Sequence, residues 1–367
     1  MKQLLLVSLT VLASTGACAA EAPSPVRLAI VGLVHDHVRG FIPSLAVHPE
    51  VQLVGIVEPD QKLGEEIAAQ FHLDPALFAP TLAALRQRSK VEAVATFTST
   101  YDHRRVVEEC AAAGLPVMME KPMAVSLADA RAMAAAARQA GVPVVVNYET
   151  TWYPSTHGAY GLVHDRRAIG DLRKIVVRDG HSGPARICSS YFLNWLTDPV
   201  LDGGGAVADF GCYGADLVTW LMDGRRPDSV FAVLQHFQPD VYPKVDDEAT
   251  IVLTYPHTQA ILQASWNWPY GRKDMELYGQ TGAVRLPDRN TLLLREGEAP
   301  EKAMALSPLP PDQADSVGYF AAVVRGRVRP TGLSSADVNV IVCEILDAAK
   351  ESARTGKRIE LAPADSR

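Results

Sequence analysis

Clusters of positive charge are missing from this chain of 367 residues. Lysine and arginine total 35 against 42 aspartates and glutamates, so the formal net charge is -7 at pH 7. A surface that binds a phosphate backbone needs Lys and Arg gathered on one face. The composition therefore argues against a nucleic-acid partner and fits an ordinary globular protein, with 48% apolar and 21% charged residues.

Cysteine is also scarce, and long apolar runs are absent. Cys110, Cys188, Cys212 and Cys343 are widely and irregularly spaced, which predicts buried free thiols and no cysteine metal site. His35 and His37 lie on alternate sides, and no nearby set of acids or cysteines completes a shell of metal ligands, so no metal is expected.

The longest apolar run near the start, residues 4–12, falls well short of the ~20 residues that a membrane span needs. Lys2 precedes this run and Ala17-Cys18-Ala19 follows it, as in a cleavable signal peptide over residues 1–19. This leader predicts a periplasmic or secreted protein with no membrane span. A loose lipoprotein box at residues 15–18 leaves lipidation as an alternative.

After the leader, apolar runs of strand length alternate with stretches of helical spacing up to about residue 148. This alternation predicts an α/β Rossmann domain with a parallel doubly wound sheet over residues 25–148. The expected strands are 26–32, 51–57, 91–97, 116–119 and 142–146, and the expected helices are 38–47, 61–71, 103–113 and 127–140.

Residues 149–367 have a different pattern. Segments 229–237, 248–255, 259–268 and 275–278 follow one another with turns between them, which predicts an α+β domain with an antiparallel sheet. A last amphipathic helix, 334–353, is expected to pack on that sheet or back onto the first domain.

The first strand leads into Gly32-Leu33-Val34-His35-Asp36-His37, where a dinucleotide-binding loop would lie. Only its first glycine is present, and Val34 stands where the second is usual. Backbone amides and the His35 or His37 imidazoles can still bind phosphate, whereas Asp36 opposes an anion unless it caps the helix.

Glu58 follows the second strand, where an acid can accept a ribose 2′-hydroxyl and repel a 2′-phosphate. It favours NAD over NADP; the alternative is a solvated turn carboxylate. Glu120-Lys121-Pro122 ends the apolar run 115–119, and this acid and amine at a sheet edge are the strongest functional signal.

These motifs, with Thr98 to His103 and with Gly203-Gly204-Gly205 leading to Asp209 and Tyr213, resemble the glucose-fructose oxidoreductase, inositol dehydrogenase and rhizopine catabolism (Gfo/Idh/MocA) family. The resemblance covers nearly the whole mature chain. It implies a C-terminal domain with a large open mostly antiparallel sheet, a homodimer or tetramer through that sheet, and hydride transfer between a sugar or polyol and nicotinamide.

In that family Lys121 resembles the lysine that touches both cofactor and substrate. Asp209 and Tyr213 share one face if residues 206–222 are helical. The family usually has His at the Tyr213 position, but the branch with glucose-fructose oxidoreductase and dihydrodiol dehydrogenase has Tyr. A phenol titrates near pH ~10, so Tyr213 transfers a proton at neutral pH only if Lys121 lowers its pKa. The alternatives are that Tyr213 packs at a domain seam and that Asp209 only caps a helix.

The resemblance also places further residues. Thr98, Ser99 and His103 would lie beside adenosine and pyrophosphate, and Asn147 and Tyr148 near the nicotinamide. Aromatic candidates for stacking on a sugar are Trp152, Tyr153, Tyr191, Trp195, Trp266 and Trp268, and polar candidates are His181, Arg186 and Asn194. Each is individually more often structural. A loop over residues 179–184 is expected to present His181.

Three functions remain open at this stage. Because an exported protein has no cytosolic NAD pool, an oxidoreductase would hold its cofactor tightly. The same cofactor could serve a glycoside hydrolase that works through transient oxidation and elimination. A non-catalytic saccharide-binding protein is the third hypothesis, favoured by Val34 and by export.

Overall fold

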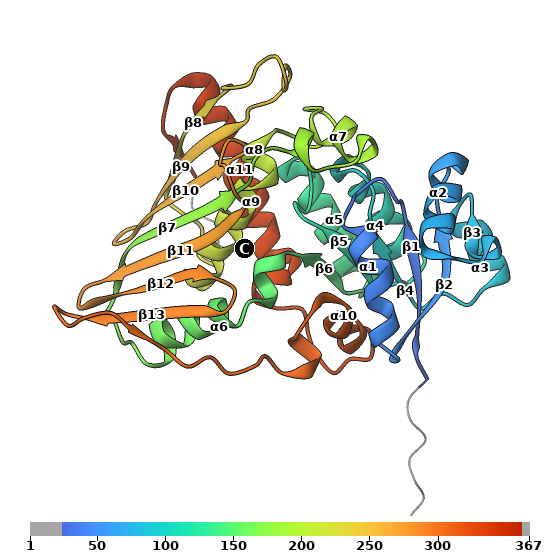
Figure 1. Cartoon of the computed structure of the whole chain (residues 1–367), viewed down its shortest axis with the longest axis horizontal. Coiled ribbons are helices and arrows are strands. Elements are labelled where there is room, and N and C mark those ends of the chain that lie inside the picture. The colour runs from blue at the N-terminus through green and yellow to red at the C-terminus, as the bar shows by residue number, and fades with distance from the viewer. Residues whose placement is uncertain (1–23, 362–367) are drawn as a thin grey trace, which may run out of the picture.

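The computed structural model describes residues 24–361, so the predicted signal peptide lies outside the described residues. Two sheets lie side by side, with helices between them (Figure 1). None of the helices within residues 24–361 is both long and apolar enough to cross a membrane.

The first sheet is parallel and has the strand order β3-β2-β1-β4-β5-β6. Its strands are β1 Val26–Val31, β2 Val51–Val57, β3 Phe78–Ala79, β4 Ala93–Thr96, β5 Val117–Glu120 and β6 Val144–Asn147. Its helices are α1 Val38–Ser44, α2 Gln61–Phe71, α3 Leu82–Arg88, α4 His103–Ala112 and α5 Leu127–Ala140. The strand order reverses between β1 and β4, which is where a doubly wound fold binds its ligand. The predicted Rossmann architecture is confirmed.

The second sheet has the order β14-β13-β12-β11-β7-β10-β9-β8-β15, and only the β7–β10 pair is parallel. Its strands are β7 Leu172–Gly180, β8 Ser229–Gln235, β9 Glu248–Thr254, β10 Gln259–Ser265, β11 Arg272–Gly279, β12 Gly282–Asp288, β13 Thr291–Glu296, β14 Lys302–Ala303 and β15 Ile359–Glu360. The mostly antiparallel sheet is confirmed. Strand β7, at its middle, was not expected: Asp179 and Gly180 end this strand, and the loop begins only at His181.

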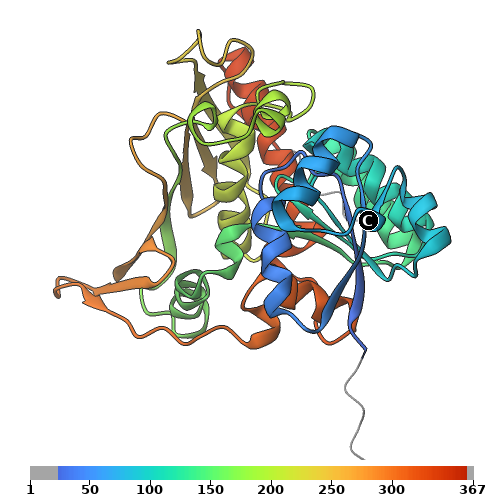
Figure 2. The ribbon, with the colours of Figure 1, turned by 45° about the vertical axis from the view of Figure 1, so that its right-hand side comes forward.

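The second half of the chain also contributes helices. They are α6 Pro154–Tyr160, α7 Ser190–Leu196, α8 Ala206–Asp209, α9 Gly211–Leu221, α10 Ser316–Val324 and α11 Ala336–Thr355. Of these, α9 and α11 lie between the two sheets (Figures 1 and 2). The short helical turns are η1 Leu45–Val47, η2 Pro75–Leu77, η3 Thr100–Asp102, η4 Glu149–Trp152, η5 Gly161–Asp165, η6 Pro184–Arg186, η7 Pro311–Gln313 and η8 Gly332–Ser334.

The helix expected over 206–222 is broken at Phe210 into α8 and α9. A Cβ on Gly205 would collide with the Asp246 carbonyl, so the turn before α8 requires glycine there. The Asp246 carboxylate accepts the amides of Gly205 and Val207 at 3.1 and 2.8 Å. These bonds fix the start of α8 and hence the position of Asp209.

The last helices return to the parallel sheet. Val317 and Phe320 of α10 share a buried cluster with Leu28 and Ile30 of β1. Helix α11 packs on both β8 and α5, as expected for the last helix. The second half of the chain therefore contributes part of the core around the first sheet.

Candidate functional site

Lys121 and Asp209 form a buried ion pair at the end of β5. The Lys121 Nζ atom donates to the Asp209 carbonyl at 3.1 Å and to its Oδ1 atom, while Trp266 Nε1 donates to Oδ2 at 2.9 Å. Burial alone would lower the pKa of Lys121, but Asp209 outweighs it and raises that pKa. Burial would raise the pKa of Asp209, but Lys121 and His181 lower it. Both groups are therefore charged at neutral pH.

Tyr213 packs beside this pair. The Lys121 and Lys273 ammonium groups lie 5.3 and 4.9 Å from the centroid of its ring. Burial first, and then the charge of Glu149, raises the pKa of Tyr213 well above its usual value near 10. The expected lowering by Lys121 is not found, because Asp209 balances that charge. At neutral pH the Tyr213 hydroxyl is a donor rather than a base.

Glu120 is the centre of a second set of polar contacts. It bonds His37 Nδ1 at 2.8 Å and accepts Asn147 Nδ2 at 2.7 Å, and Trp152 Nε1 donates to Asn147 Oδ1 at 2.9 Å. Burial would raise the pKa of Glu120, but His37, Asn147 and Lys121 outweigh it and lower that pKa. Three residues predicted to bind cofactor thus meet at the carboxyl edge of the parallel sheet.

The loop after β1 is held by Glu58. Gly32 has φ +80°, and a Cβ there would collide with Thr98, so this position requires glycine. The Glu58 carboxylate accepts the Leu33 and Asp60 amides at 2.8 and 2.9 Å. Glu58 is only 9% exposed, so the solvated-carboxylate alternative is wrong; burial raises its pKa.

Helix α7 and its flanks, residues 189–202, cover this loop. Asp36 accepts both the amide and the hydroxyl of Ser189 at 2.6 Å, so it holds the N-cap residue of α7 and does not cap α1. Trp195 Nε1 donates to the Val34 carbonyl at 3.3 Å. His35 is buried against Phe192, with ring centroids 4.6 Å apart. We call residues 189–202 the α7 cover.

The other end of the α7 cover is tied to the loop after β4. The Tyr101 amide donates to the Leu201 carbonyl at 2.9 Å, and Thr100 Oγ1 donates to Asp202 at 3.1 Å. In the same loop, the Ser99 hydroxyl donates to Asp102 at 3.0 Å and Thr98 bonds Thr96 at 3.1 Å.

His103 lies behind the Lys121-Pro122 turn. It is buried, and its Nδ1 atom bonds the Met123 carbonyl at 3.2 Å. This contact holds the turn that carries Lys121. The structure therefore gives His103 a supporting position for Lys121.

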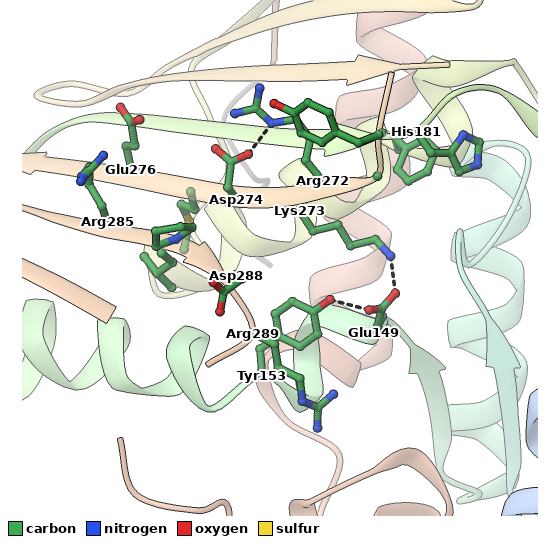
Figure 3. A pocket seen from close by; sticks show the side chains of 17 residues that line it. Glu149, Tyr153, His181, Arg272, Lys273, Asp274, Glu276, Arg285, Asp288 and Arg289 are labelled. Atoms are coloured by element: carbon green, nitrogen blue, oxygen red, sulfur yellow. Dashed lines mark hydrogen bonds and ion pairs between the residues drawn. The ribbon is translucent and has the colours of Figure 1, made fainter. Parts of the chain in front are cut away.

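A cavity of about 730 Å³ opens beside these groups, between β11, the end of β12 and η4. Figure 3 shows Lys273 and Tyr153 converging on Glu149, which bonds both side chains. The predicted residues Tyr153 and His181 line this cavity. His181 Nδ1 accepts the Gly183 amide at 3.0 Å, so Nε2 carries the proton of the neutral ring. Burial lowers the pKa of His181.

Several residues expected to contact a sugar are placed differently. Tyr148 is fully buried and donates to Asn339 at 2.8 Å. Trp266 is fully buried and holds Asp209, and Trp152 packs against Tyr319 of α10. Each of these side chains has its polar atom bonded within the protein, and none of them lines the 730 Å³ cavity.

The remaining candidates lie in or near the α7 cover. Trp195 is buried on the loop after β1, and Tyr191 is partly buried. Arg186 and Asn194 are exposed. None of these four lines the 730 Å³ cavity, and neither does Trp268, whose ring faces the Arg272 guanidinium.

Glu149 and Lys273 line the cavity and were not predicted. Glu149 directly follows β6, so its place at the carboxyl end of a parallel strand was a usable signal. Lys273 lies in a strand of alternating charges, and no local pattern distinguishes it. The two residues meet across 124 positions of sequence.

The sequence predicts no set of metal ligands around His35 and His37, but the structure places the Glu120 carboxylate beside them. One donor atom each from His35, His37 and Glu120 lies within 4.8 Å of the others. However, His35 Nδ1 already accepts the His37 amide, and His37 Nδ1 already bonds Glu120. We therefore assign no metal to this group.

Comparisons with known proteins agree with this arrangement. Residues 26–148 match the model of the oxidoreductase family with an NAD-binding Rossmann fold, and residues 163–285 match the GFO/IDH/MocA C-terminal domain. Trans-1,2-dihydrobenzene-1,2-diol dehydrogenase of Sus scrofa is 28% identical over 207 residues, which cover 56% of this chain and 57% of that protein. The enzyme of Macaca fascicularis is 27% identical, covering 62% of this chain and 63% of its own. The chain thus spans about three fifths of the length of these curated relatives.

Solved structures share the fold. An aldose-aldose oxidoreductase from Caulobacter crescentus, complexed with glycerol, has a TM-score of 0.78 and 23% identity, covering 92% of this chain and 100% of its own. An inositol dehydrogenase homolog from Azotobacter vinelandii, complexed with NAD+, has a TM-score of 0.80 and 20% identity, covering 92% and 98%.

Proposed function

Because the chain belongs to the Gfo/Idh/MocA family of oxidoreductases with an NAD-binding Rossmann fold, we propose that it is an exported NAD-dependent oxidoreductase acting on a sugar or polyol hydroxyl. The observation that carries this proposal is the Lys121–Asp209 ion pair beside Tyr213, at the carboxyl edge of the parallel sheet. An ammonium held at that edge can stabilise negative charge that develops on a substrate oxygen.

The residues around the loop fit a dinucleotide. His35 Nε2 is buried without a partner and carries the ring proton, so it is a donor available to a phosphate oxygen. Glu58 would accept a ribose hydroxyl and disfavour a 2′-phosphate, which supports NAD over NADP. Glu120, Asn147 and Lys121 would hold the nicotinamide half. When bound, NAD supplies a hydride acceptor.

Residues of the chain bind the reacting oxygen of the substrate and move its proton. Lys121 stabilises the alkoxide that forms as the substrate loses its proton, and Asp209 keeps the ammonium in place. The Tyr213 hydroxyl hydrogen-bonds the same oxygen and relays the substrate's proton to a further acceptor. His181 presents its Nε2 proton to a second substrate oxygen in the cavity.

Tight retention of the cofactor is part of this proposal. The α7 cover contacts the loop after β1, and the His37–Glu120 pair joins that loop to the end of β5. A dinucleotide must open these contacts to enter or leave. A cofactor held through many turnovers suits a protein that works away from a cytosolic NAD pool.

Two other functions have some support. The cavity volume of about 730 Å³ is in the range of sites for drug-sized ligands and has room for a glycoside, which favours an NAD-dependent glycoside hydrolase acting through transient oxidation and elimination. Val34 and the α7 cover favour a saccharide-binding protein without catalysis.

Export and assembly are likewise proposed from the sequence. The signal peptide over residues 1–19 would direct the chain to the periplasm or outside, with lipidation at Cys18 as the alternative. The open face of the second sheet supports a homodimer or tetramer.

One experiment separates the three functions. Purified protein is scanned for the absorbance of bound nicotinamide and then incubated with free sugars and p-nitrophenyl glycosides. Bound NAD that becomes NADH with a sugar supports the oxidoreductase. Release of nitrophenol without net NADH selects the hydrolase, and a complete lack of NAD binding rules out both enzymes.

A further inference from the structure

Oxidation of a hydroxyl releases a proton, and the residues nearest Lys121 are poorly suited to take it. Lys121 is itself protonated, and Asp209 is buried and does not line the cavity. Burial keeps the Tyr213 phenol protonated. His181 Nε2 already carries a proton, because Nδ1 accepts the Gly183 amide. A further group is needed to accept the proton.

Glu149 is a carboxylate at the inner wall of the cavity. It begins η4, directly after β6, and lines the cavity together with Lys273 and Tyr153 (Figure 3). Its Oε2 atom pairs with Lys273, and its Oε1 atom accepts the Tyr153 hydroxyl. Burial would raise the pKa of Glu149, but Lys273 outweighs it and lowers that pKa, so the carboxylate is ionised at neutral pH.

Glu149 and Tyr213 are electrostatically coupled. Lys273 Nζ lies 4.9 Å from the centroid of the Tyr213 ring, and the charge of Glu149 contributes to the raised pKa of Tyr213. The groups that lower the pKa of Glu149 are Lys273 from β11 by its charge and hydrogen bond, Tyr153 from the end of η4 by its hydrogen bond, and His37 from the loop after β1 by its charge. Asp179 of β7 is buried nearby, and burial raises its pKa, so it adds a neutral carboxyl group.

We propose that Glu149 is the residue that accepts the substrate's hydroxyl proton and that Lys273 is the residue that positions it. This inference rests on the proposed function. The substrate O–H bond breaks and its proton passes to the Glu149 carboxylate through the Tyr213 hydroxyl, while the hydride on the same carbon goes to NAD and the alcohol becomes a carbonyl. Glu149 then loses the proton to water in the open cavity.

The first test replaces Glu149 in the NAD-loaded protein. Glu149→Gln keeps the shape and removes the base, so we expect kcat to fall by about 100-fold with KM changed only a few-fold. In Glu149→Ala, added formate restores turnover because it supplies the missing carboxylate. The control is Glu298→Gln, an exposed carboxyl group outside the cavity. A loss below threefold in Glu149→Gln, or no formate rescue in Glu149→Ala, would overturn the proposal.

The second test needs no turnover. Phenolate absorbance is followed against pH in the unaltered protein and in Glu149→Gln, each compared with the same protein carrying Tyr213→Phe. We expect Tyr213 to ionise at lower pH in Glu149→Gln, because a neighbouring negative charge is gone and Lys273 is released. An unchanged titration contradicts the coupling. If the unaltered protein oxidises none of the sugars, the proposed function fails and the proton-accepting role of Glu149 fails with it, whereas the titration still decides whether Glu149 and Tyr213 are coupled.

Discussion

Charge placement at single residues decides what the site can do. Lys121 and Asp209 are both buried, and Trp266 occupies the second carboxylate oxygen of Asp209. Removing one partner of a buried pair leaves an uncompensated charge in a poorly solvated place, which is far more costly than removing both. The pair is therefore a requirement of the folded state as well as of the chemistry.

Asp209→Asn is expected to destabilise the protein by about 3 kcal/mol at pH 7, and Asp209→Asn with Lys121→Met is expected to recover much of that loss. Urea unfolding measures both. The lowered pKa of Asp209 adds stability above the unfolded pKa near ~3.9 that is lost as the pH falls further. That acid dependence should be weaker in the double variant; an equal dependence would count against an ionised pair.

Tyr213→Phe tests the hydroxyl beside the pair. We expect turnover to fall by orders of magnitude with NAD affinity unchanged, because the ring remains and only the proton-transferring group is lost. Steady-state kinetics and NADH fluorescence titration provide the two measurements. Unchanged turnover would refute the role given to Tyr213.

Sequence patterns identified Lys121, Asp209 and Tyr213 because they belong to short motifs. They did not separate the tryptophans that hold the site from residues that face its cavity. Trp266 follows β10 and points into the core, where its indole nitrogen bonds Asp209. Composition says that a tryptophan is large and apolar, but not which way it points. The Glu149–Lys273 pair was missed because a contact between distant segments leaves no local pattern.

At the scale of elements, the α7 cover explains why the loop after β1 departs from a glycine-rich sequence. Asp36 would repel a bound phosphate if it faced the ligand, but it is turned toward the start of α7 and bonds Ser189. Trp195 Nε1 donates a hydrogen bond to the Val34 carbonyl. The residues of this loop therefore form contacts with helix α7 of the same chain.

Asp36→Asn should release NAD faster. An amide cannot accept both Ser189 donors as strongly as a carboxylate does, so the α7 cover opens more often. We expect the dissociation rate to rise by about 10-fold, which corresponds to ~1.4 kcal/mol. Stopped-flow NADH fluorescence measures the rate, with the exposed Asp171→Asn as the matched control. Equal rates in the two variants would mean that the cover does not limit release.

Periodicity predicted the regular elements well. The bounds of α2 and α5 agree with the expected 61–71 and 127–140, because caps and apolar spacing are local. Strand β7 was missed because it lies between helical segments and pairs with β10 and β11, which come much later. The break at Phe210 depends on the contact of Gly205 with Asp246, again a distant one.

For the whole molecule, the outer face of the second sheet is the surface where assembly is proposed. Phe231 and Val233 of β8 are 38% and 49% exposed on that face. Exposed apolar side chains on a broad sheet favour self-association. Phe231→Glu with Val233→Lys is expected to convert the oligomer to a monomer in sedimentation velocity, while far-UV circular dichroism stays the same. A monomeric unaltered protein would contradict this prediction.

The return of α10 to the parallel sheet has a consequence for how the chain is made. Val317 and Phe320 complete the buried cluster around β1, and Arg325 pairs with Glu92 and bonds the Ser24 carbonyl. When the ribosome has released only the first 150 residues, the buried cluster around β1 still lacks the side chains that α10 contributes. The nucleotide-binding half therefore completes its core only after most of the chain has been synthesised.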